Sequence, residues 1–437
     1  MTTTIKKVGI YTLGCKVNQY ESEAIAEKFE ANGYSVVSAE DCCDVYVINT
    51  CTVTAESDRK ARQFIRRAHS KNQNAVILVT GCLAQTSPEE VLAIEGVSFV
   101  CGNSSKLSVV DAANKLLSGT SLSEKNAVAD INSADFEKMS ITHFDRTRAY
   151  VKIEDGCENR CTYCIIPSAR GKIRSKLPSD VISEVEELTK GGCREIVLTG
   201  IETASYGKDL EGASLADLLC RVDKIDGIGR VRLGSLDPSL ITESFVEKIK
   251  NLGSLAPHFH LSLQSGSDKV LALMKRKYNS RMAMGAIEHL RKALPEAQFT
   301  TDVIVGFPGE SEEDFTHTLE FAKQAKFLKI HIFPYSKRKG TPAAEMKNQL
   351  SKEIKHERLA RLAAVEEACR IELLKKEISE RPVCDVLFET FSDGRAIGHT
   401  ASFIEVSVPS NVPLHSVTKK VRLLTHDNNV CFGEIID

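Results

Sequence analysis

Long apolar segments and a strong net charge are both missing from this sequence of 437 residues. No apolar run approaches the ~20 residues that a helix needs to cross a lipid bilayer. Residues 1–7 are polar and lack the apolar core of a secretory signal. The net charge is only −2, so any surface that binds nucleic acid must be a local basic patch. These absences predict a cytoplasmic protein with no part in a membrane.

Cysteine is the residue that the sequence has in excess, with 14 in a chain that shows no export signal. In a reducing compartment, cysteines more often bind metals or take part in catalysis than form disulfides. Eight of them have no spacing typical of a ligand set, and we interpret these as ordinary thiols: Cys42, Cys43, Cys101, Cys193, Cys220, Cys369, Cys384 and Cys431. The remaining six form two groups of three.

The first group follows three short strand-like segments near the start of the chain. Residues 8–15, 45–51 and 76–82 are each rich in β-branched residues and each end on a cysteine. Helical patterns at 22–32 and 55–70 separate them, and this alternation predicts a parallel α/β sheet. Ligands of such sheets bind beyond the carboxyl ends of the strands. We therefore expect Cys15, Cys51 and Cys82 to meet at one edge of the sheet.

The rest of the chain divides into a linker and two further domains. Residues 119–142 are polar and without periodicity, which indicates a linker. Strand-like segments at 150–153, 195–198, 230–233, 258–263, 300–305 and 329–333 alternate with helical patterns and predict a partial (β/α)6 barrel. Ser179 is expected to cap one of its helices. One long helix at 352–380 and short strands at 383–388, 396–399, 403–408, 420–424 and 430–436 follow, and the strands predict a small all-β barrel. The predicted domains are 4–118, 143–375 and 376–437.

The second group of cysteines is Cys157, Cys161 and Cys164, spaced C-x3-C-x2-C directly after the first predicted barrel strand. Thiolates are soft ligands that suit iron–sulfur clusters. Three thiolates on one loop hold three corners of a cubane cluster and leave the fourth iron open to a substrate. Zinc is the alternative metal for such a loop.

This loop resembles that of the radical S-adenosylmethionine superfamily. Together with the first group of cysteines, the sequence resembles the methylthiotransferase branch of that superfamily over essentially the whole chain. The strings that carry the resemblance are TLGCKVNQYE at 12–21, NTCTVT at 49–54, GCLAQ at 81–85, RG at 170–171, HLSLQSG at 260–266, GFPGE at 306–310 and FPYSKRKGT at 333–341. The resemblance implies that the terminal β-barrel is of the RNA-binding, TRAM-like kind.

The resemblance also implies the cofactors, which are two [4Fe–4S] clusters and S-adenosylmethionine. The C-x3-C-x2-C loop would hold the cluster that cleaves S-adenosylmethionine to a 5′-deoxyadenosyl radical, and the first cysteine group would hold an auxiliary cluster that carries sulfur. Such an enzyme delivers a methylthio group to an unactivated carbon, and it needs an external one-electron donor and a sulfur source. We expect a monomer. The alternatives are a non-catalytic iron–sulfur or RNA-binding protein, and a radical enzyme whose second cluster only relays electrons.

Further site residues follow from the same resemblance and from local clusters of basic residues, of which the cluster on the predicted helix after Cys51 could also be an ordinary solvated face. Those expected near the cofactor, mostly at strand ends, are Tyr163, Thr199, Gly200, Ser235, Gln264, Val305, Gly306 and Phe333. Those expected to contact the substrate or its RNA are Lys16, Asn18, Arg59, Arg62, Arg66, Arg338, Lys419, Lys420 and Arg422. The rings of Phe391 and Phe403 are expected to offer stacking faces for bases.

Three substrates occur in the branch that the sequence resembles: isopentenyladenosine in tRNA, threonylcarbamoyladenosine in tRNA, and an aspartate of a ribosomal protein. The string after Cys15 is Lys16-Val17-Asn18, which is similar to that of the threonylcarbamoyladenosine enzymes. The expected substrate is therefore threonylcarbamoyladenosine next to the anticodon, modified at carbon 2 of the adenine. Lys16 or a nearby arginine is expected to pair with the threonyl carboxylate, a contact worth about 1.5–3 kcal/mol.

Overall fold

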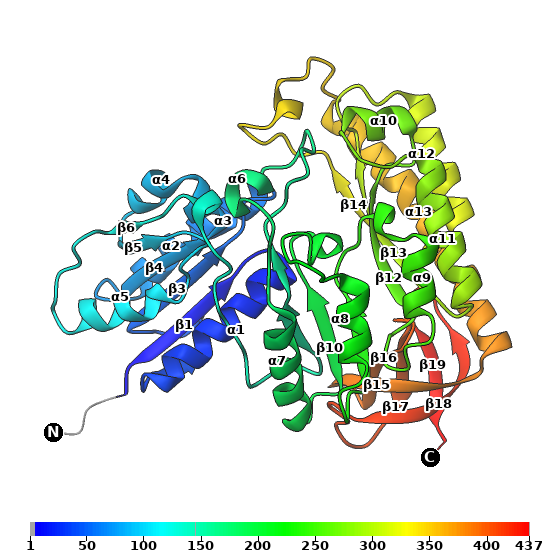
Figure 1. The fold of residues 1–437 in the computed structure, drawn as a ribbon, viewed down its shortest axis with the longest axis horizontal. Coiled ribbons are helices and arrows are strands. Elements are labelled where there is room, and N and C mark those ends of the chain that lie inside the picture. Colours follow the sequence, from blue (N-terminus) through cyan, green and yellow to red (C-terminus); the bar gives the residue numbers. More distant parts are fainter. Residues whose placement is uncertain (1–4, 145, 437) are drawn as a thin grey trace.

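The computed structural model of the protein describes residues 5–144 and 146–436, which form three units in chain order (Figure 1). An N-terminal α/β unit lies beside a central, partly closed barrel, and a small β-barrel lies at one end of the central unit. This arrangement confirms the predicted fold class. No helix among these residues is both long enough and apolar enough to cross a membrane.

The N-terminal unit is built on a six-stranded parallel sheet with the order β2-β1-β3-β4-β5-β6. The strands are β1 Lys7–Thr12, β2 Ser35–Val37, β3 Val45–Thr50, β4 Val76–Gly81, β5 Val97–Cys101 and β6 Asn126–Ala127, and the helices are α1 Lys16–Ala31, α2 Ala55–Lys71, α3 Cys82–Thr86, α4 Pro88–Leu92 and α5 Ser108–Leu117. Every residue of β3 and β4 is buried, because helices cover both faces of the sheet. The strands β1, β3 and β4 are direct neighbours, so their carboxyl ends lie together.

The segment predicted as a linker is not without structure. It contains β6, which pairs in parallel with β5, and a short 3-10 helix η1 at Ile131–Ser133. It therefore completes the N-terminal sheet before the chain enters the central unit. The two-residue length of β6 leaves too few residues for a periodic pattern, so the sequence gives no sign of it.

The central unit contains six parallel strands in the order β7-β10-β11-β12-β13-β14, in which isolated bridges from Val231 to Leu255 and from Leu236 to Leu261 join the two halves. The strands are β7 Ala149–Lys152, β10 Glu195–Thr199, β11 Arg230–Leu233, β12 His258–Gln264, β13 Gln298–Val305 and β14 Lys329–Pro334. All six agree with the predicted segments to within about two residues. Among the described residues β7 and β14 do not pair with each other, so the barrel is open along one side.

Helices cover the outside of this barrel. They are α7 Pro178–Lys190, α8 Leu215–Val222, α9 Glu243–Ile249, α10 Asp268–Leu273, α11 Ser280–Ala293 and α12 Glu312–Ala325, with 3-10 helices η2 Thr203–Ser205, η3 Pro238–Leu240 and η4 Pro342–Glu345. The short helix α6 Ile166–Arg170 instead packs against α3 of the N-terminal unit. A two-stranded ribbon of β8 Glu154–Asp155 and β9 Arg174–Ser175 brackets the second cysteine group. The predicted cap at Ser179 is wrong: Pro178 occupies the first turn, so the helix begins at Pro178 and Leu177 is the N-cap.

The C-terminal part begins with the long helix α13 Lys352–Glu380, which packs on β14. The closed barrel that follows has the strand order β15-β16-β17-β19-β18. Its strands are β15 Val383–Ser392, β16 Arg395–Thr400, β17 Glu405–Pro409, β18 Thr418–His426 and β19 Cys431–Ile435. The barrel lies below the central strands, at the end where those strands begin (Figure 1).

Candidate active site

The first cysteine group lies at one edge of the N-terminal sheet. Cys15 is the N-cap of α1, Cys51 directly follows β3, and Cys82 is the first residue of α3. All three are free thiols. Gly14 allows this gathering, because its backbone has a φ of +103° and a Cβ there would lie 2.9 Å from Sγ of Cys51. The structure thus brings together the three cysteines that were expected to meet because each follows a strand of the parallel sheet.

The protonation of these thiols is controlled by their surroundings. Burial raises the pKa of Cys51 to about 12, and the neighbouring Cys82 adds to the effect. Cys15 has an exposed surface, yet enough protein surrounds it that burial raises the pKa of its thiol too, against the opposing charge of Arg170. Thiols in such a site lose their protons when a cationic metal centre binds, because metal coordination favours the thiolate. The donor set therefore fits an iron–sulfur cluster.

The second cysteine group lies on the loop between β8 and α6. The amide of Cys157 donates to the carbonyl of Gly171, and the Thr162 hydroxyl donates to the carbonyl of Leu273 at 2.8 Å, so both ends of the loop are anchored. Burial raises the pKa of Cys157 and of Cys164 to about 12. This loop resembles the first group in chemistry, with three free thiols in an enclosed setting.

The spacing of the thiols argues against a single metal ion at either place. Among the described residues, the one set of three side chains whose ligand atoms all lie within 4.8 Å of one another is His260, Asp302 and His331. A tetrahedral zinc site holds its sulfurs about 3.8 Å apart, since each metal–sulfur bond is about 2.3 Å. Neither cysteine group has that compact spacing, whereas a cubane cluster holds its thiolates at separate corners.

Each cysteine group receives one hydrogen bond from a buried arginine. Arg170 donates from Nε to Sγ of Cys82 at 3.3 Å, and Arg276 donates from Nη1 to Sγ of Cys161 at 3.3 Å. Arg276 is held in place by an ion pair with Asp237 at 2.9 Å. Hydrogen bonds to ligating sulfurs tune the reduction potential of a cluster. The sequence indicated neither contact, because each arginine meets its cysteine only in the folded chain.

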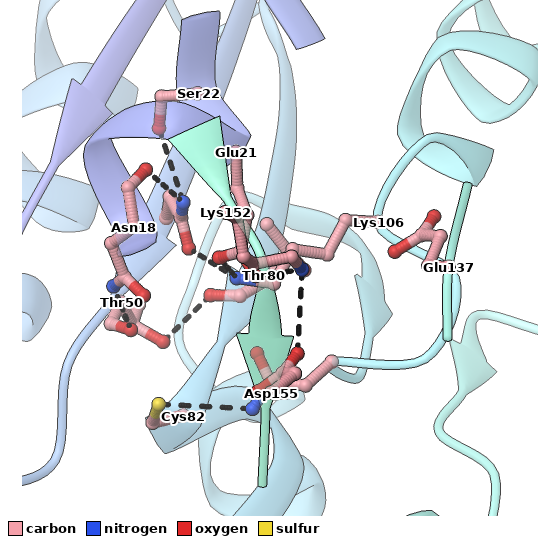
Figure 2. Close-up of polar contacts among 12 residues, drawn as sticks. Asn18, Glu21, Ser22, Thr50, Thr80, Cys82, Lys106, Glu137, Lys152 and Asp155 are labelled. Atoms are coloured by element: carbon pink, nitrogen blue, oxygen red, sulfur yellow. Dashed lines mark hydrogen bonds and ion pairs between the residues drawn. The ribbon is translucent and has the colours of Figure 1, made fainter. Parts of the chain in front are cut away.

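A buried charge network joins the N-terminal unit to the central barrel. Glu21, on α1, accepts from Lys106 at 2.5 Å, from Lys152 at 3.0 Å and from Arg170 at 2.6 Å, and its side chain is inaccessible to solvent. Figure 2 shows Glu21, Lys106 and Lys152 meeting between the two units. Burial alone would raise the pKa of Glu21, but the three cations lower it well below its usual value. The network therefore contains an ionised carboxylate that holds the two cysteine-bearing units in register.

The predicted cofactor residues only partly share one cavity. A cavity of about 250 Å³ beside Cys164 is lined by Tyr163, Gln264 and Phe333, together with Asp302. Gln264 has a φ of 65°, a left-handed backbone that is uncommon for this residue type and that often marks a functional position. The lining of this cavity does not include Thr199, Gly200, Ser235, Val305 or Gly306.

The predicted RNA-contacting residues are spread over several environments. Arg59 pairs with Glu56, Arg62 with Glu90, Arg338 with Asp58 and Arg422 with Glu434, while Arg66 and Lys420 are exposed and Lys419 is half-buried. Asn18 is buried, and its side chain bonds to Leu13, Thr50 and Arg170. The two predicted rings also differ. Phe391 is exposed, whereas Phe403 is half-buried and its ring stacks on His258 of the central barrel and on His399 of the C-terminal barrel, so Phe403 is less open to a base than expected.

Lys16 lines a second, larger cavity of the central barrel, although the residue as a whole is exposed to solvent. Burial lowers the pKa of its ammonium, the charges of Arg148 and Arg232 lower it further, and Asp302 and Cys15 act in the opposite direction. Lys16 therefore lies within electrostatic reach of both the first cysteine group and the barrel interior.

Known proteins are similar to this chain over both of the units that contain the cysteine groups. Residues 151–322 match the family model described as the radical SAM superfamily, and residues 7–102 match the one described as uncharacterized protein family UPF0004. Threonylcarbamoyladenosine tRNA methylthiotransferase MtaB of Bacillus subtilis is 42% identical over 95% of this chain and 93% of its own length. The protein of the same name from Thermotoga maritima is 43% identical over 81% of this chain and 80% of its own.

A relative with a different name is also similar over the full length. The tRNA-2-methylthio-N(6)-dimethylallyladenosine synthase of Aquifex aeolicus is 33% identical over 99% of both chains. Among solved structures, the radical S-adenosylmethionine methyltransferase TsrM from Kitasatospora setae has a TM-score of 0.58 at 14% identity, covering 83% of this chain and 91% of that chain. This last likeness concerns the fold alone.

Proposed function

This chain belongs to the radical S-adenosylmethionine methylthiotransferase family, and on that basis we propose that it converts threonylcarbamoyladenosine next to the anticodon of tRNA to its 2-methylthio derivative. The observation that carries the proposal is the similarity to relatives named for this reaction, at 42% and 43% identity, against 33% for a relative named for the dimethylallyl nucleoside. The string Lys16-Val17-Asn18 after the first cysteine supports the same substrate.

The family uses S-adenosylmethionine and [4Fe–4S] clusters. When bound, these groups supply a 5′-deoxyadenosyl radical and a methylthio group, which together replace an unreactive carbon–hydrogen bond. In our proposal Cys157, Cys161 and Cys164 hold the cluster next to the 250 Å³ cavity, where Tyr163 and Phe333 offer apolar surfaces to the cofactor. Cys15, Cys51 and Cys82 hold the auxiliary cluster.

The protein's own contribution is to fix these two sites relative to each other. The network around Glu21 lies between them, and it is closed to solvent, so charge interactions within it are strong. Arg170 and Arg276 orient one thiolate in each site. A substrate base bound between the two sites would therefore keep a fixed position relative to both. Fixed positions of the reacting groups are the main requirement of a reaction between bound groups.

The reaction requires partners beyond tRNA. We infer an external one-electron donor and a sulfur source, since nothing in the amino-acid chain supplies either, and a cytoplasmic location, where tRNA is modified. We further infer that the C-terminal barrel from residue 376 onward contacts the RNA, and that the protein acts as a monomer.

Nucleoside mass spectrometry of tRNA from a strain without this gene tests the proposed substrate. We expect 2-methylthio-threonylcarbamoyladenosine to disappear, threonylcarbamoyladenosine to accumulate, and plasmid-borne wild-type protein to reverse both. Loss of the methylthio-isopentenyl nucleoside instead would assign the other tRNA substrate. Unchanged tRNA together with an unmodified ribosomal aspartate would assign the protein-modifying reaction.

A further inference from the structure

The interior of the central barrel contains a cavity of about 510 Å³, distinct from the cavity beside Cys164. Its walls include the first residues of two barrel strands, His258 of β12 and Lys329 of β14, whereas the cavity beside Cys164 is lined by Gln264 at the end of β12. The C-terminal barrel contributes Phe403 and His399 to the wall, and Lys16 enters from the N-terminal unit. All three units of the fold therefore form this one space.

The lining of this cavity is rich in positive charge. The cations are Lys16, Arg148, Arg232, Lys329 and Arg370, and Glu405 is the one acidic side chain in the lining. Some of these cations are already neutralised, since Arg148 and Arg232 both donate to Glu195, at 2.7 and 2.8 Å. Lys16 is different, because none of the acidic side chains in the described parts of the chain forms an ion pair with it.

Two other groups in the same lining are buried, unlike Lys16, and have unused hydrogen-bonding capacity. Nη1 of Arg232 and Nδ1 of His258 are both enclosed and have no partner among the described residues, although the two side chains are only 3% and 7% exposed. Unpaired buried polar groups are costly, so native proteins rarely keep them without a ligand or water. The occupant of the cavity could therefore contact three unpaired nitrogen groups: the ammonium of Lys16, Nη1 of Arg232 and Nδ1 of His258.

A metal ion is a poor occupant for this space. His260, Asp302 and His331 have the spacing of a metal site. However, Asp302 already pairs with Nε2 of His260 at 3.1 Å, and Nδ1 of His260 is within hydrogen-bonding distance of Thr300 Oγ1. A dication would also be repelled by the surrounding arginines and by Lys16. The charge of the cavity favours an anion.

We propose that this cavity binds the carboxylate of the threonyl group of the substrate nucleoside, with Lys16 and Arg232 as its cationic contacts. This inference rests on the proposed function. Lys16 directly follows Cys15, so a base whose carbon 2 lies at the first cysteine group places its N6 substituent within reach of the barrel interior. An isopentenyl group is uncharged and gains nothing from these cations. The cavity therefore determines which nucleoside is accepted.

Binding of synthetic anticodon stem–loops tests the proposal without turnover. Cluster-loaded protein, oxidised and without reductant, is titrated with stem–loops that carry threonylcarbamoyladenosine, isopentenyladenosine or plain adenosine, and fluorescence anisotropy gives each Kd. We expect Lys16→Met to weaken binding of the threonylcarbamoyl stem–loop by about 10- to 100-fold and to leave the other two unchanged. Lys16→Arg should restore most of the affinity. Lys28→Met, at the exposed far end of the same helix, is the matched control and should change nothing.

Two results would overturn the proposal. An equal loss on all three stem–loops would mean that Lys16 binds an RNA phosphate, and no loss on any of them would mean that it binds nothing in the RNA. Iron content of each variant is measured alongside, so that a lost cluster is not mistaken for a lost contact. Failure of the proposed function is separable: wild-type protein would then methylthiolate the isopentenyl stem–loop and not the threonylcarbamoyl one.

Discussion

Arg170 donates a hydrogen bond from Nε to Sγ of Cys82, and Nη1 of the same guanidinium donates to the carboxylate of Asp155 at 3.2 Å. Asp155 lies two residues before Cys157, and its other oxygen contacts Lys152. One fully buried side chain therefore links the first cysteine group to the loop that bears the second. Because Arg170 also pairs with Glu21, any change at this position affects the interface and both sites together.

Replacing Arg170 tests the structural importance of the buried network. Arg170→Gln removes one of the two cations that Glu21 and Asp155 share in a solvent-free interface, the other being Lys152, and breaking such a pair destabilises a protein by about 3–5 kcal/mol. We expect a clear fall in the thermal midpoint of the variant. The control Arg66→Gln alters an exposed arginine of α2. It should change the free energy of unfolding by less than about 0.5 kcal/mol and so leave the thermal midpoint almost unchanged. Equal midpoints for the two variants would contradict the role of the network.

The two cysteine groups are expected to make separable contributions. Reconstituted wild-type protein should contain about eight irons per chain, and either triple alanine variant about four. Changing Cys157, Cys161 and Cys164 should abolish formation of 5′-deoxyadenosine. Changing Cys15, Cys51 and Cys82 should preserve it and abolish methylthio transfer. Full methylthio transfer by the second variant would refute the sulfur-carrying role of that site.

Gly14 provides a steric test of the auxiliary site. Gly14→Ala places a methyl group 2.9 Å from Sγ of Cys51, so Cys51 or the backbone at residue 14 must shift and the site is distorted. We expect this variant to retain about half of the iron, with the loss confined to the first cysteine group. Gly33→Ala is the matched control, since Gly33 also has a positive φ, of +81°, but has nothing within 4 Å of the added atom. Alanine at either position is strained, because both backbones have a positive φ. A lower iron content in both variants would therefore show that backbone strain, and not the contact with Cys51, causes the loss.

The carboxylate of Asp314 is expected to make the free energy of unfolding depend on pH. Burial alone would raise the pKa of this carboxyl, but hydrogen bonds from Lys269, Ser311 and Ser267 lower it below its usual value of 3.8. Because the folded-state pKa is the lower one, the stabilisation is present above pH 3.8 and is lost as the pH falls through the folded-state pKa.

Asp314→Asn should therefore be less stable than wild type at neutral pH, by about 1–2 kcal/mol after allowance for the exposed Lys269. The difference in thermal midpoint should shrink as the pH falls below about 4. The neighbouring Glu313→Gln, at an exposed position of the same helix turn, should show no such trend. A difference for Asp314→Asn that stays constant with pH would show that the ionised carboxylate is not responsible.

Much of this fold follows from local signals in the sequence. The helix 352–380 is predicted with its observed bounds, because a continuous charged pattern fills it. The meeting of Cys15, Cys51 and Cys82 at one edge of the sheet follows from the topology, since three neighbouring parallel strands each end just before a cysteine. Periodicity and cap residues are local properties, and they remain visible without knowledge of the fold.

The contacts that join the units are what the sequence conceals. Glu21, Lys106 and Lys152 are charged, and charged residues are ordinarily at the surface. Their burial depends on partners 85 and 131 residues away along the chain. Phe403 is missed for a similar reason: its ring is covered by His258 of the central barrel, which only the packing of two units brings near. Glu21 and Arg170 do lie in strings that carry the family resemblance, and this was the one available signal.

Conversion of a defined substrate by the purified protein tests the proposed reaction directly. Reconstituted, reduced protein is incubated without oxygen with S-adenosylmethionine and tRNA that carries threonylcarbamoyladenosine, and the digested nucleosides are analysed by mass spectrometry. We expect 2-methylthio-threonylcarbamoyladenosine from wild-type protein and none from the variants that lack either cysteine group. Unmodified threonylcarbamoyladenosine from wild-type protein that has both clusters and produces 5′-deoxyadenosine would contradict the proposed reaction.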